Sequence, residues 1–347
     1  MNRIESLNQQ TPDNSILLKQ VVQSRLESLD IVPNENLGQH FLIDETAINL
    51  LTNSISPGNK VLEVGAGVGQ LTEALAGNAS KVVAIEIDRR YEPILSELSN
   101  KYSNLHVVYG DALAIRLQDF VAKEDGNDTQ IIASIPYHIT EPFMRRIAEL
   151  DIESATMVVG RKLAESIKAQ NEDGLGFGKL TLLAQSFFDI DVLMELGRHS
   201  FLPAPRTESS IIRLSPKEGS SNMRDFLLRR LFLTSRQNPL VGNCLKEGLT
   251  KFTEQQSLGL RSKKERSKML RRSAKFDLKQ AASEYNAYGK IDISGDNSNG
   301  RTRLLRVGER AIVDGFGIPS DILGKPFDKL NNSELRSLSL ALRGKDR

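Results

Sequence analysis

The sequence predicts an α/β fold with a parallel sheet covered by helices on both faces, and a smaller, mostly helical C-terminal domain. Between residues 60 and 216, short apolar segments rich in β-branched residues alternate with segments of helical spacing. Strands of a parallel sheet that is covered on both faces have that composition. From about Met223 onward the chain becomes basic and poor in strand-like segments. Its 347 residues are enough for two domains.

The elements follow in order along the chain. Residues 1–15 are polar and are expected to lack stable structure, and the apolar spacing of "SILLKQVVQSRLESL" predicts an amphipathic helix. A second helix is expected after Asp44, which is a suitable N-cap. Strands are then expected at 60–65, 81–87, 105–110, 130–135, 154–160 and 209–216. The apolar run 180–196 continues the alternation, and "NNSEL" near the C-terminus has the pattern of a capping box.

Composition shifts divide the chain into three predicted parts. The linker-like segment "SPKEGSSN" begins at Ser215 and separates the strand-rich part from the basic part. We therefore expect an N-terminal extension with a helix over 1–36, a sheet-containing domain over 37–218 and a basic helical domain over 219–347.

The bulk composition excludes several classes of protein. Hydrophobic residues make up 39% of the chain and charged residues 26%, as in ordinary globular proteins. Without a run of eighteen apolar residues, or a basic and then apolar N-terminus, neither a membrane span nor secretion is expected. One cysteine, Cys244, and four scattered histidines predict no disulfide and no metal site. A reducing cytoplasmic or organellar interior fits these features, and we expect a cytoplasmic monomer.

The net charge of +2 conceals an uneven distribution. Residues 221–310 contain twenty Lys and Arg but nine Asp and Glu, a net charge of +11, so the rest of the chain carries −9. Such asymmetry favours a polyanionic partner for the basic part. A solvated helical face is the alternative interpretation.

A glycine-rich turn follows the first predicted strand of the sheet. In "VLEVGAGVGQLT", Gly65, Gly67 and Gly69 lie between a strand and a helix, where glycines let the backbone approach a ligand closely. A dinucleotide-binding fingerprint requires a further glycine at position 70, which is Gln here, so a dehydrogenase is disfavoured. The pattern instead resembles the first motif of S-adenosylmethionine-dependent methyltransferases, which have a Rossmann-like sheet.

Two acids follow the next two strands. Glu86 ends the predicted strand 81–87 about twenty residues after the glycines, and Asp111 follows the strand 105–110. A carboxylate at the first position can accept hydrogen bonds from both ribose hydroxyls, and one at the second suits an adenine amino group. Either acid alone could instead cap a helix or a turn. Together, beside a glycine loop, they favour a nucleoside-containing cofactor at the carboxyl edge of the sheet.

The fourth strand of the sheet ends in "SIPYHIT". Many enzymes that methylate exocyclic amino groups of bases carry Asn, Asp or Ser, followed by x-Pro-aromatic, at this position, which here is Ser134 to Tyr137. Hydrogen-bond acceptors on the amine steer its delocalised lone pair toward reaction. Pro136 fixes the direction of the preceding carbonyl, and Tyr137 can stack on a base taken out of its helix. The alternative is a structural turn with a core tyrosine.

With these motifs, the chain resembles the ribosomal RNA adenine N6-dimethyltransferases. This family includes small-subunit dimethylases and the erythromycin-resistance methylases that act on large-subunit RNA. The resemblance covers most of 37–214 and again 314–343. It rests on "LGQHFLID", "EVGAGVGQLT", "AIEID", "GDAL", "SIPYHIT", "GFGKLTLLAQSFF", "FLPAPRTESSIIRL" and "ILGKPFDKLNNSELRSLSLAL".

Carried over position by position, the resemblance implies two groups of site residues. The cofactor, S-adenosyl-L-methionine, would contact His40, Leu42, Gly65, Gly67, Glu86, Asp111 and Ser134. The target adenine would lie against Ser134, Pro136, Tyr137 and Phe201. The chain departs from the family at position 134, where relatives usually have Asn, and over 245–313, which is hard to match.

The basic segment "RSKKERSKMLRR" lies within that unmatched region. Seven cations there could neutralise phosphates and give affinity that depends on salt but not on sequence, which suits a structured RNA. They are Arg261, Lys263, Lys264, Arg266, Lys268, Arg271 and Arg272. A targeting role for this segment is a weaker alternative.

The resemblance implies dimethylation of N6 of adenine in ribosomal RNA, in the small subunit during ribosome assembly, by direct displacement at the sulfonium methyl group. Methylation of large-subunit RNA is the first alternative. Two further alternatives are a binding factor with little or no catalysis, suggested by Ser134, and a DNA adenine methyltransferase. The expected partner is therefore ribosomal RNA or a precursor of a ribosomal subunit.

Overall fold

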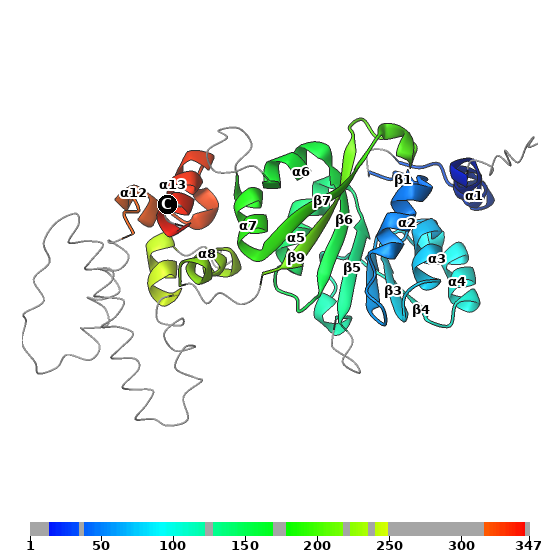
Figure 1. Cartoon of the computed structure of the whole chain (residues 1–347), viewed down its shortest axis with the longest axis horizontal. Helices are drawn as coiled ribbons and strands as arrows, with labels where there is room; N and C mark the ends of the chain where they lie inside the picture. Colours follow the sequence, from blue (N-terminus) through cyan, green and yellow to red (C-terminus); the bar gives the residue numbers. More distant parts are fainter. Residues whose placement is uncertain are drawn as a thin grey trace, which may run out of the picture. The chain divides into compact units, whose positions relative to one another are not determined.

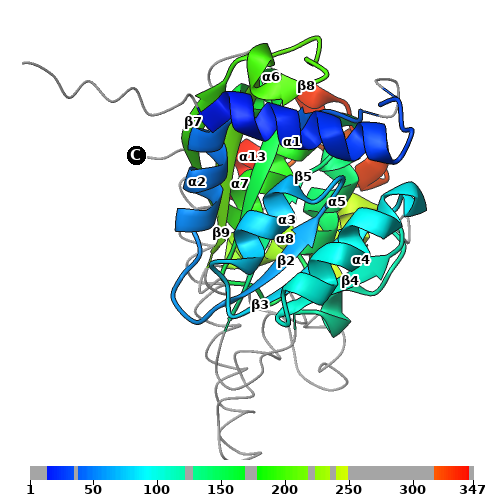
Figure 2. The same cartoon turned by 90° about the vertical axis from the view of Figure 1, so that its right-hand side faces the viewer.

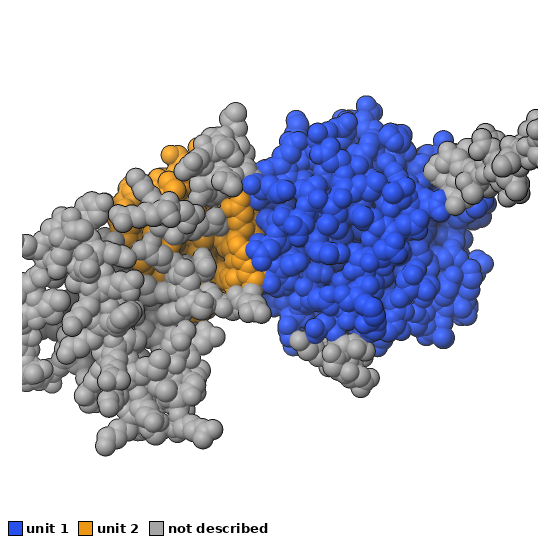
Figure 3. Space-filling model, viewed as in Figure 1, with its two compact units in different colours: residues 1–168, 188–216 blue, residues 169–187, 217–347 orange. Residues whose placement is uncertain are grey.

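The computed structural model describes residues 14–34, 38–121, 128–168, 178–217, 223–234, 240–248 and 316–343. The chain forms two compact units, which Figure 3 colours separately. The first contains residues 1–168 and 188–216, and the second contains residues 169–187 and 217–347. Within the described ranges, no helix is long and apolar enough to cross a membrane.

The first unit holds the predicted sheet (Figure 1). Its helices are α1 (Asn14–Ser28), α2 (Glu45–Asn53), α3 (Gln70–Ala76), α4 (Glu92–Lys101), α5 (Thr140–Ile147) and α6 (Arg161–Lys168). Its strands are β1 (Phe41–Leu42), β2 (Lys60–Val64), β3 (Lys81–Glu86), β4 (Leu105–Tyr109), β5 (Thr129–Ser134), β6 (Ser154–Gly160), β7 (Phe188–Leu196), β8 (Phe201–Leu202) and β9 (Ser209–Pro216). Short 3₁₀ turns lie at Arg89–Tyr91 (η2), Leu117–Asp119 (η3), Tyr137–Ile139 (η4) and Arg198–Ser200 (η5).

The main sheet has the strand order β4-β3-β2-β5-β6-β9-β7. Strands β2 to β6 are parallel, and β9 and β7 add an antiparallel edge. The order reverses between β2 and β5, so right-handed crossovers put α3 and α4 on one face and α5 on the other. Ligands of open α/β sheets bind at the carboxyl ends of the strands beside such a reversal.

The central strands form because their side chains are buried on both faces. In β3 the residues Val82 to Glu86 are all buried, and in β5 Ile131 to Ala133 are 0–1% exposed. β-Branched side chains fit that environment. The predicted strands at 60–65, 81–87, 105–110, 130–135, 154–160 and 209–216 are therefore confirmed to within a residue.

Helix α1, predicted as part of an N-terminal extension, packs into the core of the first unit. Its Val22 and Leu26 belong to the same buried cluster as side chains of β2 and β3, and Figure 2 shows α1 running across α2 and α3. Asp44 caps α2 as predicted, because its Oδ1 accepts a hydrogen bond of 3.1 Å from the Ala47 amide.

The short pair β1 and β8 was not predicted. Phe41 lies opposite Leu202, and Leu42 lies opposite Phe201. The Ile43 amide donates to the Ser200 carbonyl at 2.8 Å. This pairing brings the "GQHFL" segment beside the "FLPAP" segment, although about 160 residues separate them in the chain.

The second unit is helical in its described part. It contains α7 (Lys179–Phe187), α8 (Met223–Thr234), a helical segment 241–248, α12 (Ser320–Leu323), η7 (Phe327–Lys329) and α13 (Asn332–Arg343). Phe232 packs edge-on against Phe327, with ring centroids 4.8 Å apart. The predicted capping box is confirmed, because Asn331 and Glu334 each accept a hydrogen bond from the other's amide.

The apolar run 180–196 divides between the two units. Its first part is α7, which groups with the second unit, and the remainder is β7 of the main sheet. Residues 178–187, expected within the sheet-containing domain over 37–218, therefore belong to the helical unit. A continuous apolar run gives no sign of where helix changes to strand.

Candidate functional site

A cavity of about 730 Å³ opens at the carboxyl edge of the sheet, beside the reversal of strand order. It is lined by the residues that follow β2, β3, β4 and β5 and by the segment before β1. All seven predicted cofactor contacts line it: His40, Leu42, Gly65, Gly67, Glu86, Asp111 and Ser134.

The glycine loop forms one wall of this cavity and can contain no side chains at its closest points. Gly65, Gly67 and Gly69 have φ values of 87°, 56° and 80°, which disfavour any residue with a Cβ. A Cβ at Gly65 would lie 2.7 Å from the Ser134 carbonyl oxygen, and one at Gly67 would lie 3.0 Å from the Phe41 ring. The loop therefore packs closely against β5 and β1, which leaves no room for a Cβ at Gly65 or Gly67.

Glu86 lies in this cavity with both carboxylate oxygens engaged. Its Oε2 accepts a hydrogen bond of 2.7 Å from the Gly67 amide, and its Oε1 accepts one of 2.8 Å from the Asp88 amide. Burial raises the pKa of Glu86 above its usual value, while these amide donors act in the opposite direction. A carboxylate offers about four lone-pair positions, so acceptor capacity for ligand hydroxyls remains.

Asp111 lines the same cavity from the turn after β4. Its Oδ1 accepts a hydrogen bond of 2.8 Å from the Leu113 amide, and its main-chain carbonyl accepts from Ala114 and Ile115. The side chain is exposed to solvent. One carboxylate oxygen thus stabilises the turn, and Oδ2 accepts no hydrogen bond from the part of the chain that the structure describes, so it can meet a donor in the cavity.

Among the cavity residues that were not predicted, Gln39, Asp88 and Arg90 form a polar cluster. The Gln39 side chain donates to Asp88 Oδ2 at 3.0 Å, and Arg90 pairs with the same carboxylate at 2.5 Å. Hydrogen bonds from Arg90, followed by its charge, lower the pKa of Asp88. Asp88 lies only two residues after Glu86, so the doubled acid in "EIDRR" was the available signal.

A neighbouring helix also stabilises the glycine loop. Arg25 of α1 donates to the Val68 carbonyl at 3.0 Å and pairs with Glu73 of α3 at 2.6 Å. Glu73 also pairs with Lys101 at 2.6 Å. These contacts join α1 to the loop between β2 and α3, and no sequence motif indicated them.

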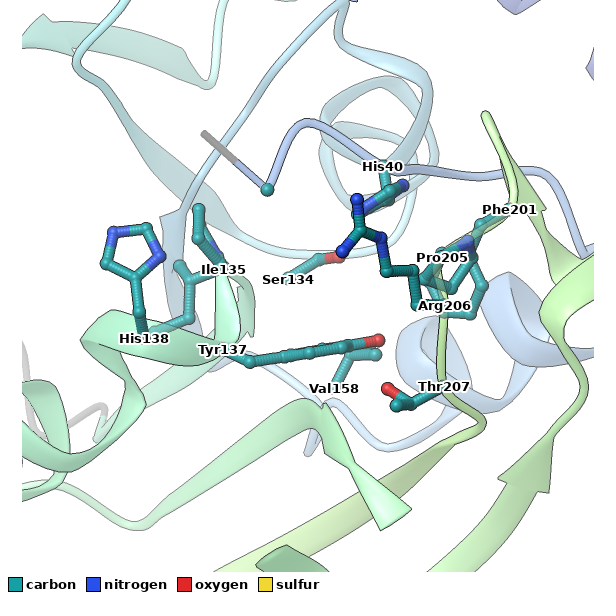
Figure 4. Close-up of a pocket in the computed structure, with 12 residues that line it drawn as sticks. His40, Ser134, Ile135, Tyr137, His138, Val158, Phe201, Pro205, Arg206 and Thr207 are labelled. Atoms are coloured by element: carbon teal, nitrogen blue, oxygen red, sulfur yellow. The ribbon is translucent and has the colours of Figure 1, made fainter. Parts of the chain in front are cut away.

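A second, smaller cavity of about 260 Å³ shares a wall with the first. Figure 4 shows Ser134, Tyr137, His138, Phe201 and Arg206 around it. The residues common to both cavities are Gly38, His40, Ser134, Ile135, Pro136 and His138. All four residues predicted to hold the target base, Ser134, Pro136, Tyr137 and Phe201, line the smaller cavity.

Hydrogen bonds and packing hold the two aromatic rings of the smaller cavity. The Tyr137 hydroxyl is hydrogen-bonded to the Ser209 hydroxyl, and its ring lies over Gly160, where a Cβ would be 3.7 Å away. Burial raises the pKa of Tyr137, so the phenol stays protonated at neutral pH. Phe201 is 4% exposed. His40 connects the cavity wall to the strand pair, because its Nδ1 lies 2.8 Å from the Pro203 carbonyl oxygen.

The arrangement therefore places a large polar and apolar cavity against a small aromatic one, with Ser134 at their boundary. Among the described residues, no group of three or more His, Cys, Asp and Glu side chains could hold a metal ion. The seven predicted RNA-binding cations, Arg261, Lys263, Lys264, Arg266, Lys268, Arg271 and Arg272, lie outside the described residues.

Comparison with known proteins shows which family the sequence matches. Residues 33–267 match the family described as ribosomal RNA adenine dimethylase. The chain is 31% identical over 226 residues to the probable ribosomal RNA small subunit methyltransferase A of Pyrococcus abyssi, covering 64% of this chain and 79% of that protein. It is 33% identical over 190 residues to the ribosomal RNA small subunit methyltransferase A of Geobacillus kaustophilus, covering 53% of this chain and 64% of that protein.

Two solved structures are similar at lower identity. A dimethyladenosine transferase from Plasmodium falciparum is 23% identical, with a TM-score of 0.49, over 88% of this chain and 98% of that one. The 23S rRNA methyltransferase ErmE is 22% identical, with a TM-score of 0.46, over 79% of this chain and 99% of that one.

Proposed function

Because the chain belongs to the ribosomal RNA adenine dimethylase family, we propose that it transfers methyl groups from S-adenosylmethionine to N6 of adenine in small-subunit ribosomal RNA. The names of the curated relatives favour the small subunit. The observation that carries the proposal is the shared wall of the two cavities. A methyl donor in the larger cavity and a base in the smaller one would meet at Ser134.

The larger cavity fits the cofactor by the chemistry of its lining. Glu86 would accept hydrogen bonds from the ribose hydroxyls, and Asp111 Oδ2 would accept from the adenine amino group. Gly65 and Gly67 line the cavity with main chain only, against which the methionine part would lie. When bound, the cofactor supplies an electrophilic methyl group attached to a sulfonium. The sulfur is the leaving group and keeps the electron pair of the broken C–S bond.

The smaller cavity fits a single base taken out of its helix. Tyr137 and Phe201 provide aromatic surfaces for stacking, and a flipped base is commonly held in this way. The Ser134 hydroxyl and the Ile135 carbonyl would accept hydrogen bonds from the amine and orient its nitrogen toward the methyl group. Positioning of this kind can supply much of a rate enhancement.

The proposed reaction needs no strong base from the protein. Among the described residues, no Asp or Glu lines the smaller cavity, and Tyr137 remains a neutral phenol because burial raises its pKa. Attack by the amine nitrogen forms the N–C bond, and the resulting cation then loses its proton to water. The same steps on the singly methylated amine give the dimethylated product.

We infer that the protein acts as a monomer in the cytoplasm, where it meets a precursor of the ribosomal subunit. The basic domain predicted over 219–347 would bind RNA through its phosphates. Arg206 lines the smaller cavity and would add a cation beside the target nucleotide.

Methyl transfer from labelled S-adenosylmethionine to three acceptors tests the proposal. The acceptors are small subunits lacking dimethyladenosine, matched large subunits and duplex DNA. Label in small-subunit RNA is the expected result. Label in large-subunit RNA would favour the resistance-type activity, and label in DNA would favour a DNA methyltransferase. Cofactor binding without label in any acceptor would favour a binding factor.

A further inference from the structure

Arg146, in the last turn of α5, is unlike its neighbour Arg145. Arg145 pairs with Glu141 on its own helix at 3.4 Å. Among the described residues, no carboxylate pairs with Arg146. Its two terminal nitrogens instead donate to the carbonyl oxygens of Leu113 and Ile115, about thirty residues earlier in the chain. The half-buried guanidinium of Arg146 thus donates its hydrogen bonds to two neutral carbonyls of one turn.

That turn is the wall of the larger cavity that carries Asp111. Residues 110–113 line the cavity. Within the turn, the Leu113 amide donates to Asp111 Oδ1, and the amides of Ala114 and Ile115 donate to the Asp111 carbonyl at 2.8 and 2.9 Å. These hydrogen bonds use the amide N–H groups of the turn but not the carbonyl oxygens of Leu113 and Ile115. The carbonyls of Leu113 and Ile115 take their hydrogen bonds from Arg146.

The spacing of those carbonyls explains why an arginine stands at this position. The two acceptors belong to residues two apart, and Arg146 reaches each with a different nitrogen of its planar guanidinium. A lysine ammonium is a single point donor on a flexible stem and cannot hold both acceptors in a fixed relation. Hydrogen bonds from a charged donor are also stronger than neutral ones.

We propose that Arg146 is a positioning residue that determines how selectively the cavity recognises the base of its nucleoside cofactor. By holding both carbonyls, Arg146 fixes the turn so that Asp111 directs its free carboxylate oxygen into the cavity. That oxygen accepts a hydrogen bond from an adenine amino group and repels the carbonyl oxygen that hypoxanthine carries at the same place. The inference rests on the proposed function, because it takes S-adenosylmethionine as the occupant.

The test compares two stable ligands by titration calorimetry: S-adenosylhomocysteine and its hypoxanthine counterpart, S-inosylhomocysteine. The wild-type chain should prefer the adenine ligand. Arg146→Gln should weaken binding of that ligand by about tenfold, the effect of losing roughly 1.4 kcal/mol of hydrogen bonding. Its affinity for the hypoxanthine ligand should change little, so the preference collapses. The preference of Arg146→Lys for the adenine ligand should lie between those of the wild type and Arg146→Gln.

Arg145→Gln is the matched control, since it removes the same charge one residue away, and it should bind both ligands as the wild type does. Equal weakening of both ligands by Arg146→Gln would assign Arg146 a merely structural role and overturn the inference. An unchanged preference would do the same. If Arg146→Gln does not fold, Arg146→Lys carries the comparison.

This measurement is independent of methyl transfer. A chain that prefers the adenine ligand but methylates no RNA would refute the proposed activity and leave the role of Arg146 intact. Failure of the wild-type chain to bind either ligand would overturn the cofactor assignment, and the inference with it.

Discussion

Ser134 is the residue at which the chain departs from the family pattern expected from its sequence, in which Asn occupies this position. Its backbone is tightly held, because its carbonyl lies against Gly65 with no room for a Cβ. The difference from Asn therefore lies in the side chain alone. A hydroxyl can accept one hydrogen bond from the target amine but has a shorter reach than a planar amide.

Replacing Ser134 tests that role. We predict that Ser134→Ala lowers the single-turnover rate constant of methyl transfer about 3- to 10-fold, the effect of a neutral hydrogen bond worth about 0.5–1.5 kcal/mol, and that Ser134→Asn raises it above the wild type. The measurement is single-turnover methylation at saturating cofactor. If Ser134→Ala reacts at the wild-type rate, the hydroxyl does not orient the amine.

Glu63, inside β2, makes stability depend on pH. Burial raises its pKa from 4.5 to about 8, with Thr72 acting in the opposite direction and Glu86 adding to the rise. The folded chain therefore keeps a proton that the unfolded chain releases. The free energy of unfolding decreases as pH rises from about 4.5 to about 8, by up to about 1.4 kcal/mol per pH unit.

Glu63→Gln isolates this effect, because the amide is neutral at every pH. We expect urea unfolding at pH 5 to give similar stabilities for variant and wild type, and at pH 8 to find the variant more stable. Parallel pH dependences for the two proteins would mean that Glu63 titrates normally.

Some residues of the site could be predicted individually from the sequence, and others could not. Glu86 and Ser134 end apolar strands and Asp111 comes shortly after one, so all three lie at the carboxyl edge of the sheet. Arg25 and Arg146 act through main-chain carbonyls more than thirty residues away, and backbone acceptors have no signature in sequence. Such contacts appear only once the fold is known.

At the scale of elements, the central strands were predictable because each is a short, buried, β-branched segment. The pair β1 and β8 was not, since two-residue strands carry no periodicity. The division of 180–196 into α7 and β7 was hidden by continuous apolarity. The strand pair contributes Phe201 to the lining of the smaller cavity. The change from helix to strand comes at the point in the sequence where the chain passes from one unit to the other.

The glycine loop allows a prediction at this scale. Gly65→Ala should weaken cofactor binding and destabilise the fold by roughly 1–2 kcal/mol or more, because position 65 has a left-handed backbone and meets the Ser134 carbonyl. Gly77→Ala is the matched control. Gly77 has an ordinary φ of −74° with its nearest neighbour at 3.6 Å, so the added methyl should be neutral or stabilising by about 0.4–1 kcal/mol. Thermal unfolding measures the stability of each variant, and calorimetry measures its cofactor affinity. Equal stability and equal affinity for the two variants would contradict the role of the glycine loop in the cofactor site.

At the scale of the whole molecule, the sheet unit supplies both proposed ligand cavities, and the charge imbalance points to the C-terminal part for RNA affinity. The segment 261–272 lies outside the described residues, so its role stays a prediction from charge. Replacing its seven Lys and Arg by Gln should weaken RNA binding and flatten the dependence of affinity on salt, by about 0.7–0.9 in the logarithmic slope per lost phosphate contact. Cofactor affinity should stay unchanged. A preserved salt slope would make the segment a solvated surface.

The measurement that tests the central claim most directly is the mapping of N6,N6-dimethyladenosine in ribosomal RNA from cells with and without this protein. We predict that the modified adenines occur in small-subunit RNA when the protein is present and are lost when its gene is deleted. Undiminished dimethyladenosine in the deletion cells, or a loss confined to large-subunit RNA, would contradict the claim.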